Sequence, residues 1–390
     1  MTISMKSTSP QPSIARLDSL TGLRWWAAFA VFFFHLRNLM PMPGILGPIA
    51  QYGYLGVTFF FVLSGFVLTW SWRPSVGIGT FYWRRIARIF PLHLTALALA
   101  IPVFYSLTPD PAHPWENPFD GGVLLLNVFL LQGWSRDLNV LFSGNPAAWT
   151  LTAELFFYAL HPFIMKPLRR LQARGALWVA LGVLLISVLV RVAIIAAPTG
   201  WLAGLPWPVL RLNEFVIGMS LAWAIRSGWR PRFRAWLPVG GMVLYLGTLS
   251  LLERIPDSQG AHDLLASGTS ETMTVLFALL ICAFAANDIA GRSRLMRARP
   301  LLALGEWSYA FYLVHATLIY AARDLVGYQT FGKKGIAISL LVLAASIALS
   351  WLLHIGIERP AERRLRAMQN GWAAAITARR AGQRTGAASS

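Results

Sequence analysis

An arginine and a histidine lie eleven positions apart in the first apolar segment, which reads RWWAAFAVFFFH from Arg24 to His35. Ionisable side chains in a membrane segment are energetically costly and tend to be functional. Eleven residues of α-helix make about three turns and rise about 16 Å, so the two side chains would share one face. That rise is about half the hydrocarbon thickness of a bilayer. The spacing predicts a polar path from Arg24 at the cytoplasmic surface to His35 near mid-membrane, where an imidazole could move a proton.

Two other apolar segments also carry ionisable residues. Glu154 lies about six residues into the segment that contains WTLTAELFFY, and Arg211 and Glu214 lie three positions apart in RLNEFVIGM. Residues three apart are neighbours on a helix, so Arg211 and Glu214 could form an ion pair. A structural ion pair and a substrate contact both remain open for these two residues.

A polar stripe lies on the segment GEWSYAFYLVHATL, where Ser308, Tyr312 and His315 are separated by one helical turn each. Such a stripe faces protein or water rather than lipid. By contrast, Ser64 in VLSGF stands beside a glycine and is typical of close helix packing. The single cysteine, Cys282, has no basic neighbour in sequence and is interpreted as an apolar filler.

Three arginines precede the third apolar segment in FYWRRIARIFPLH, namely Arg84, Arg85 and Arg88. Arg85 and Arg88 occupy neighbouring positions on a helical turn. Guanidinium groups match phosphate oxygens, so the functional interpretation is a phosphate clamp. The alternative is that these arginines only mark the cytoplasmic end of a membrane span.

The composition identifies a polytopic membrane protein with an all-α fold. Of its 390 residues, 56% are hydrophobic and only 13% are charged, whereas a soluble domain carries roughly 25% charged residues. The net charge of +18 is divided among short clusters between apolar segments, which argues against nucleic acid as a partner. We find no metal-ligand spacing, no P-loop and no G-x-S-x-G motif, and we expect no bound metal.

Ten apolar segments are long enough to cross a bilayer, so we predict a bundle of about ten transmembrane helices. They lie at about 22–40, 54–72, 86–106, 148–166, 175–197, 209–226, 236–253, 270–287, 301–322 and 334–357. A further piece, 121–134, is only fourteen residues long, and we predict a re-entrant or interfacial segment there rather than an eleventh crossing.

Charge predicts the orientation of this bundle. With ten crossings, both termini lie in the cytoplasm, and 26 of the 34 Lys and Arg residues fall on that side. We therefore divide the chain into a cytoplasmic N-terminal segment (1–20), a transmembrane domain (21–366) and a disordered basic cytoplasmic tail (367–390). The location expected is the cytoplasmic (inner) membrane of a bacterium.

Seven sequence elements in a fixed order resemble the membrane-bound acyltransferase 3 family, which includes O-antigen, exopolysaccharide and macrolide acyltransferases. The resemblance runs from about residue 16 to residue 366. The elements are LDSLTGLRWWAAFAVFFFH, GVTFFFVLSGFVL, RRIARIFPLH, WTLTAELFFY, RLNEFVIGM, GEWSYAFYLVHATL and IERP.

The resemblance implies an inner-membrane enzyme that moves an acyl group, often acetyl, from cytoplasmic acyl-CoA to a hydroxyl group of a sugar or related acceptor. The first-span Arg and His of the family correspond to Arg24 and His35, its RxxR element to Arg85 and Arg88, and its membrane-embedded acidic position to Glu154. Acyl-CoA (acetyl-CoA) is then a donor substrate, and no permanently bound cofactor is implied. Some members carry a fused extracytoplasmic SGNH hydrolase-like domain. This chain ends soon after IERP, so any hand-off partner would be a separate periplasmic protein.

Acyl transfer from a thioester to an alcohol needs a base, and we assign this role to His35 because the unperturbed pKa of a histidine side chain lies near operating pH. Glu154 is expected to bond the other ring nitrogen of His35 and fix its tautomer. Arg24, Arg85, Arg88 and Arg84 are expected to hold the donor phosphates while its pantetheine arm reaches His35. A covalent acyl-histidine is a less favoured alternative.

The remaining candidate residues are assigned to substrate binding. They are Trp149, Tyr158, Arg211, Glu214, Ser308, Tyr312 and His315. Trp149, Tyr158, Tyr312 and the backbone amides near Gly65 are the candidate donors to an oxyanion. The acceptor is expected to be a surface polysaccharide or lipid-linked glycan, with a macrolide or other secreted metabolite as the alternative.

Two other function classes fit the composition. A proton-coupled transporter could use a buried His and Glu as a relay, although the clustered arginines and the lack of an internal repeat argue against it. An acyl conduit that passes acetyl to a separate periplasmic transferase would share the same donor site.

Overall fold

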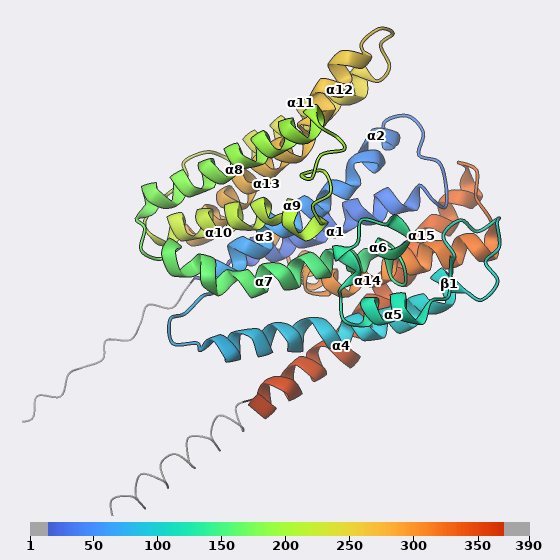
Figure 1. The fold of residues 1–390 in the computed structure, drawn as a ribbon, viewed down its shortest axis with the longest axis horizontal. Coiled ribbons are helices and arrows are strands. Elements are labelled where there is room, and N and C mark those ends of the chain that lie inside the picture. The colour runs from blue at the N-terminus through green and yellow to red at the C-terminus, as the bar shows by residue number, and fades with distance from the viewer. Residues whose placement is uncertain (1–14, 370–390) are drawn as a thin grey trace, which may run out of the picture.

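A computed structural model describes residues 15–369 as a bundle of α-helices that lie side by side (Figure 1). Most of the predicted N-terminal segment and nearly all of the predicted tail lie outside these residues. The helices are α1 (Asp18–Leu36), α2 (Leu46–Gln51), η1 (Tyr52–Leu55), α3 (Gly56–Trp70), α4 (Ile78–Phe104), α5 (Gly121–Val128), η2 (Gln132–Trp134), α6 (Leu138–Leu141), η3 (Pro146–Ala148), α7 (Trp149–Leu168), α8 (Ala173–Ala196), α9 (Trp207–Leu210), α10 (Leu212–Arg226), α11 (Trp236–Leu252), α12 (Gln259–Ser267), α13 (Thr269–Ile289), η4 (Leu295–Arg297), α14 (Arg299–Val326), α15 (Lys333–Leu353) and η5 (His354–Glu358). Two-residue strands, β1 (Tyr105–Ser106) and β2 (Asn117–Pro118), pair in parallel.

The predicted all-α fold is confirmed, and each of the ten predicted apolar segments lies on a long helix. Within the described residues, six helical stretches are long and apolar enough to cross a membrane, so the count of about ten spans is not confirmed. These stretches are Leu46–Trp70, Ile78–Phe104, Ala173–Ala196, Trp207–Arg226, Thr269–Ile289 and Lys333–Gln369. Helix α11 is shorter, with 17 residues. Helices α1, α7 and α14 are long enough, but they carry the polar side chains of the cavity described below, which lower their mean hydropathy.

The short segment at 121–134 is broken into two pieces, as its length suggests. Helix α5 has eight residues, a rise of about 12 Å, which is far less than the hydrocarbon thickness. Asp120 caps its N-terminus by accepting from the backbone amides of Gly122 and Val123. The buried Asn127 donates to Ser143 Oγ over 2.7 Å, which ties this piece to the loop before α7.

Glycines allow the helices that carry the candidate residues to pack backbone against backbone. A Cβ atom on Gly65 of α3 would lie 2.0 Å from the carbonyl oxygen of Phe215 on α10, and one on Gly218 would lie 2.0 Å from that of Val62. At the contact of α1 with α14, a Cβ atom on Gly305 would lie 1.9 Å from the oxygen of Thr21. Small residues at such contacts are typical of membrane helix pairs.

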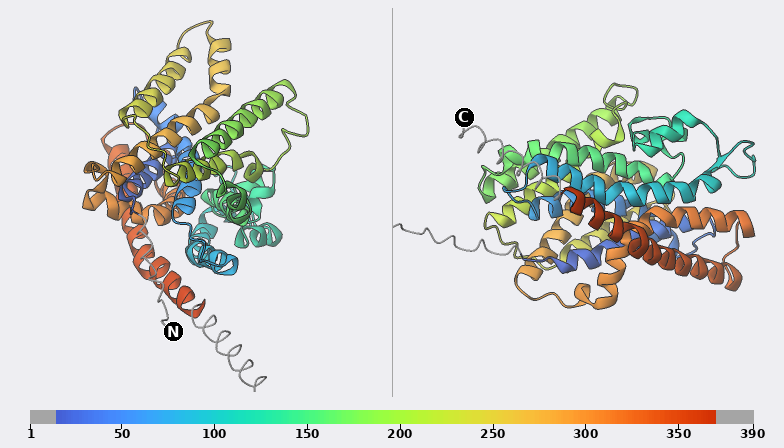
Figure 2. Two further views of the ribbon diagram at one scale, coloured as in Figure 1. Left: turned by 90° about the vertical axis from the view of Figure 1, so that its left-hand side faces the viewer. Right: turned by 90° about the horizontal axis from the view of Figure 1, so that it is seen from below.

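The last helix packs across the bundle. Helix α15 continues through η5, a π-helical turn in which His354 Nδ1 and Glu358 Oε2 lie 2.7 Å apart, and then on to residue 369. The part after η5 crosses beside α4 (Figure 2), where Trp83 Nε1 donates to the oxygen of Leu365 over 2.7 Å. The α4 arginines thus lie near the contact between α4 and the helical segment that follows η5.

Candidate active site

A cavity of about 350 Å³ lies among α1, α3, α4, α7 and α14, and each of these helices contributes polar side chains to it. Its apolar wall includes Phe60, Phe61, Leu68 and Leu151. The polar groups are Arg24, Ser64, Ser71, Arg85, Arg88, Thr150, Glu154, Tyr158, Ser308, Tyr309 and Tyr312. Seven residues predicted from sequence therefore meet in one place: Arg24, Arg85, Arg88, Glu154, Tyr158, Ser308 and Tyr312.

Three guanidinium groups line this cavity. Arg85 and Arg88 share one face of α4 because they are three positions apart, and Arg24 faces them from α1. The Arg85 guanidinium lies over the Tyr158 ring, 5.7 Å from its centroid. Within residues 15–369, none of the three forms an ion pair or a side-chain hydrogen bond, so their donors are available to an anion.

Among residues 15–369, Glu154 is the only carboxylate that lines the cavity, and it interacts with two hydroxyl groups. Ser64 Oγ donates to its Oε1 over 3.2 Å, and the Tyr158 hydroxyl, one turn along α7, donates to the same oxygen. The predicted hydrogen bond between Glu154 and His35 is wrong, because Nδ1 of His35 is buried without a partner. Glu154 instead places one negative charge among the three arginines.

Aromatic side chains form another part of the cavity wall. The ring centroids of Phe60 and Tyr312 lie 5.9 Å apart. Thr150 Oγ1 shares its one proton between the oxygen of Ala147, 3.0 Å away, and the Tyr312 hydroxyl, 3.2 Å away, and no acceptor for the proton of Tyr312 is found in the described part of the chain. Ser308 Oγ donates to the oxygen of Gly305 over 2.8 Å, so the proton of that hydroxyl is already engaged.

His35 lies beside this cavity and does not line it. Its ring centroid is 5.2 Å from that of His315, which in turn is 5.8 Å from that of Tyr312. Nδ1 of His315 is 3.1 Å from the oxygen of Phe311, which can only accept, so this nitrogen carries the proton. Nε2 of His315 and Nδ1 of His35 are buried without partners. Tyr312 and His315 thus lie between the cavity and His35, so Arg24 and His35 do not line one cavity.

Besides His35 and His315, four predicted residues lie outside the cavity. Arg84 precedes Arg85 and occupies a different face of α4. The Trp149 ring packs against Phe61 and Trp207, with centroid distances of 6.3 and 6.1 Å. The other two, Arg211 and Glu214, belong to a separate network, from which Arg211 Nη2 donates to Thr58 Oγ1 of α3 over 2.8 Å.

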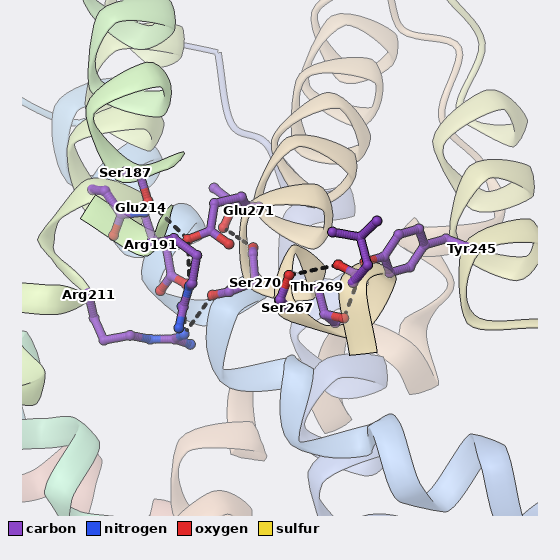
Figure 3. A network of polar contacts seen from close by, with 12 residues as sticks. Ser187, Arg191, Arg211, Glu214, Tyr245, Ser267, Thr269, Ser270 and Glu271 are labelled. Atoms are coloured by element: carbon purple, nitrogen blue, oxygen red, sulfur yellow. Dashed lines mark hydrogen bonds and ion pairs between the residues drawn. The ribbon is translucent and has the colours of Figure 1, made fainter. Parts of the chain in front are cut away.

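Figure 3 shows that network between α8, α10 and α13. Arg211 Nη1 lies 3.1 Å from Glu214 Oε1 and donates to Ser270 Oγ over 3.0 Å. Nearby, Arg191 Nε lies 3.3 Å from Glu271 Oε1. The ion pair lies within the first turn of α10, and Arg211 links that turn to α13 through Ser270, which favours the structural alternative.

Four polar residues of the cavity were not among the predicted site residues, namely Ser64, Ser71, Thr150 and Tyr309. Ser64 was interpreted as a packing residue, but Gly65 makes the close helix contact and Ser64 lies one position away, facing Glu154. Tyr309 also lines the cavity, and its hydroxyl donates to the oxygen of Ile89 over 3.2 Å. Spacing offered a signal for Tyr309, three residues before Tyr312, and for Thr150, four residues before Glu154. The contact of Ser64 with Glu154, in contrast, crosses between helices and has no local signal.

One group of residues of metal-ligand type lies away from the cavity. His113 Nδ1 is 3.0 Å from Glu116 Oε1, and His113 Nε2 is 3.3 Å from Asp324 Oδ1. Each ring nitrogen thus faces a different carboxylate, an arrangement that a protonated imidazole satisfies by itself.

Comparison with known proteins agrees with this architecture. A family model described as "Acyltransferase domain" matches residues 17–355. The chain is 32% identical over 377 residues to "Acyltransferase MdmB" of Streptomyces mycarofaciens, which covers 91% of this chain and 94% of that protein. It is 28% identical over 239 residues to "Nodulation protein 10" of Rhizobium leguminosarum bv. viciae, covering 52% of this chain and 62% of that protein.

A third relative is the "O-acetyltransferase OatA" of Staphylococcus aureus, which is 21% identical over 368 residues, with 89% of this chain and 57% of that protein covered. The match thus spans little more than half the length of OatA. No solved structure is significantly similar to the chain. The family model covers most of the sequence and the cavity gathers the elements of the resemblance, so the chain belongs to the acyltransferase 3 family.

Proposed function

We propose that this protein is an integral membrane O-acyltransferase that moves an acetyl or related acyl group from cytoplasmic acyl-CoA to a hydroxyl group of a cell-surface or lipid-linked carbohydrate. The observation that carries the proposal is the cavity with three unpaired guanidinium groups and a wall that leads through Tyr312 to two histidines. Phosphate is the anion that guanidinium forks match best among common metabolites, and coenzyme A carries three phosphate groups.

The donor would bind with its phosphates at Arg24, Arg85 and Arg88. A cavity of about 350 Å³ is at the small end of ligand-site volumes, so it would hold only part of a large donor. The thioester arm would follow the apolar wall toward Tyr312. The excess of basic residues on the predicted inner side supports a cytoplasmic entrance at this end, with both termini in the cytoplasm.

His35 would act as the general base. The acceptor oxygen attacks the thioester carbonyl carbon as its proton moves to His35, and collapse of the tetrahedral intermediate breaks the C–S bond. The departing sulfur takes the proton from the imidazolium, so free CoA and an ester are the products. His315 would orient His35, since its unpartnered Nε2 can accept from Nδ1–H of His35 and leave Nε2 of His35 free as the base.

Tyr312 is the candidate donor to the oxyanion. Tyr158 donates its proton to Glu154, and Trp149 lies outside the cavity, so neither competes for this role. The Tyr312 hydroxyl accepts from Thr150 and keeps its own proton for a developing negative charge.

The proposal can be tested with purified protein in nanodiscs, supplied with acetyl-CoA and a crude membrane extract as the source of acceptor. We expect the wild type to bind acetyl-CoA and release free CoA. His35→Ala should bind acetyl-CoA but release no free CoA. His262→Ala, which changes a surface histidine outside the cavity, is the matched control and should behave as wild type. Absence of acetyl-CoA binding by the wild type would refute the donor assignment and favour a transporter. Equal CoA release by His35→Ala would refute the assigned base.

A further inference from the structure

A second cavity, of about 730 Å³, lies at the end of α1 opposite Arg24. Residues that line it include Phe34, Arg37 and Asn38 from the end of α1, Gln51 from the end of α2, Glu253 after α11, and Tyr328 after α14. Its volume is within the range typical of small-molecule sites. Neither the family resemblance nor the donor site assigns a ligand to it.

This second cavity adjoins His35 from the side away from the arginine cluster. Asn38 Nδ2 donates to the backbone oxygen of His35 over 3.0 Å, and the rings of Phe34 and His35 have centroids 5.1 Å apart. The donor cavity approaches His35 through Tyr312 and His315. The turn of α1 that carries His35 therefore lies between the two cavities, and the His35 side chain lines neither of them.

The wall beside α1 is held in place by contacts with the loop after α14. Arg323 Nη1 donates to the oxygen of Asn38 over 2.9 Å, and its guanidinium lies 5.5 Å from the centroid of the Tyr328 ring. The backbone amide of Gln329 donates to the oxygen of Leu39 over 2.9 Å. These contacts fix Tyr328 relative to the turn of α1 that carries His35.

The polar side chains of the second cavity are free to bind a ligand. The side chains of Arg37, Gln51, Glu253 and Arg254 line it, and within the described chain none of them forms a hydrogen bond or an ion pair. Guanidinium and amide donors, carboxylate and amide acceptors, and the aromatic ring of Tyr328 match the hydroxyl groups and apolar face of a sugar. Glu253 offsets one of two arginines here, so this cavity is less suited to a polyphosphate than the first.

We propose that this second cavity binds the acyl acceptor, a neutral glycosyl group that presents one hydroxyl to His35. This inference rests on the proposed acyltransferase function. It adds that donor and acceptor enter from opposite ends of α1 and meet at His35.

The experiment uses the full chain in its own host, with the chromosomal copy deleted and variants expressed in its place. Cells are fed deuterated acetate, from which they make acyl-CoA, and labelled esters are located by tandem mass spectrometry of the extracted glycans and glycolipids. Gln51→Trp fills the second cavity, and Glu253→Gln removes its carboxylate with little change of shape. Lys334→Ala removes an exposed positive charge from the beginning of α15, outside this cavity, and is the control. Acetyl-CoA binding is measured in parallel on each purified variant.

We expect at least a tenfold loss of labelled glycosyl ester for Gln51→Trp and a smaller loss for Glu253→Gln. Acetyl-CoA binding should match the wild type in both, and Lys334→Ala should change neither readout. Retention of the labelled ester by Gln51→Trp would overturn the acceptor site. A further variant, Ser187→Trp, fills the cavity beside Arg211. Loss of the labelled ester in Ser187→Trp but not in Gln51→Trp would also overturn the site. A label that depends on the protein but lies on a non-sugar hydroxyl would overturn the glycosyl class. Failure of the acyltransferase proposal itself would be distinct, because the wild type would then bind no acetyl-CoA.

Discussion

The rings of His35 on α1 and His315 on α14 have centroids 5.2 Å apart, and each ring has one buried nitrogen without a partner. Unpaired polar atoms in a membrane bundle are costly, and these adjacent rings are the ones proposed to act as base and positioning residue. The backbone oxygen of Phe311 fixes the tautomer of His315, which makes its free nitrogen an acceptor.

His315→Ala should lower kcat for acyl transfer about 10- to 100-fold, below the roughly 10²- to 10⁴-fold contribution of a general base itself. The apparent KM for acyl-CoA should stay unchanged, because His315 does not line the donor cavity. His315→Gln, whose amide oxygen can accept from Nδ1–H of His35, should recover part of the lost kcat. Steady-state kinetics in nanodiscs would measure both values. A rise in KM with kcat intact would contradict the positioning role.

The two neighbouring arginines of α4 provide a matched pair of variants. Arg85→Ala should raise the KM for acyl-CoA about 10- to 100-fold, because a hydrogen bond to a charged group contributes about 1.5–3 kcal/mol. Arg84→Ala removes the same charge from a face that does not line the cavity, so KM should change less than about twofold. Titration with acetyl-CoA would compare them. Equal effects would mean that general positive charge, and not the cavity, attracts the donor.

Two tyrosines three residues apart on α14, Tyr309 and Tyr312, separate the oxyanion role from packing. Tyr312→Phe should lower kcat about 10²- to 10³-fold, as expected for loss of one oxyanion donor. Tyr309→Phe should have a much smaller effect, since that hydroxyl already donates to the oxygen of Ile89. Single-turnover measurements with saturating donor would isolate the chemical step. Similar rates for the two variants would remove Tyr312 from the mechanism.

Local sequence properties predicted the helices and much of the donor cavity. Apolar length locates each segment, and a spacing of three or four residues puts Arg85 with Arg88, and Glu154 with Tyr158, on shared faces. The errors concern relations between helices, which no local pattern contains. Glu154 was assigned to His35 but contacts α3 through Ser64, because the packing of α3 on α10 decides which face of α3 meets α7.

That packing predicts a stability effect at Gly65. A methyl group at this position would lie 2.0 Å from the oxygen of Phe215, a backbone atom that can move only if α3 and α10 separate. Gly65→Ala should therefore destabilise the bundle by about 1–3 kcal/mol or more, as overpacking does. Gly247→Ala on α11 meets no atom within 4 Å and should leave the melting temperature unchanged or slightly raised. Thermal unfolding of both variants in the same detergent would measure the difference. Ser64 and its bond to Glu154 adjoin this contact, so Gly65→Ala should also lower acyl transfer in the protein that remains folded. Unchanged stability and activity would show that α3 does not need close contact with α10.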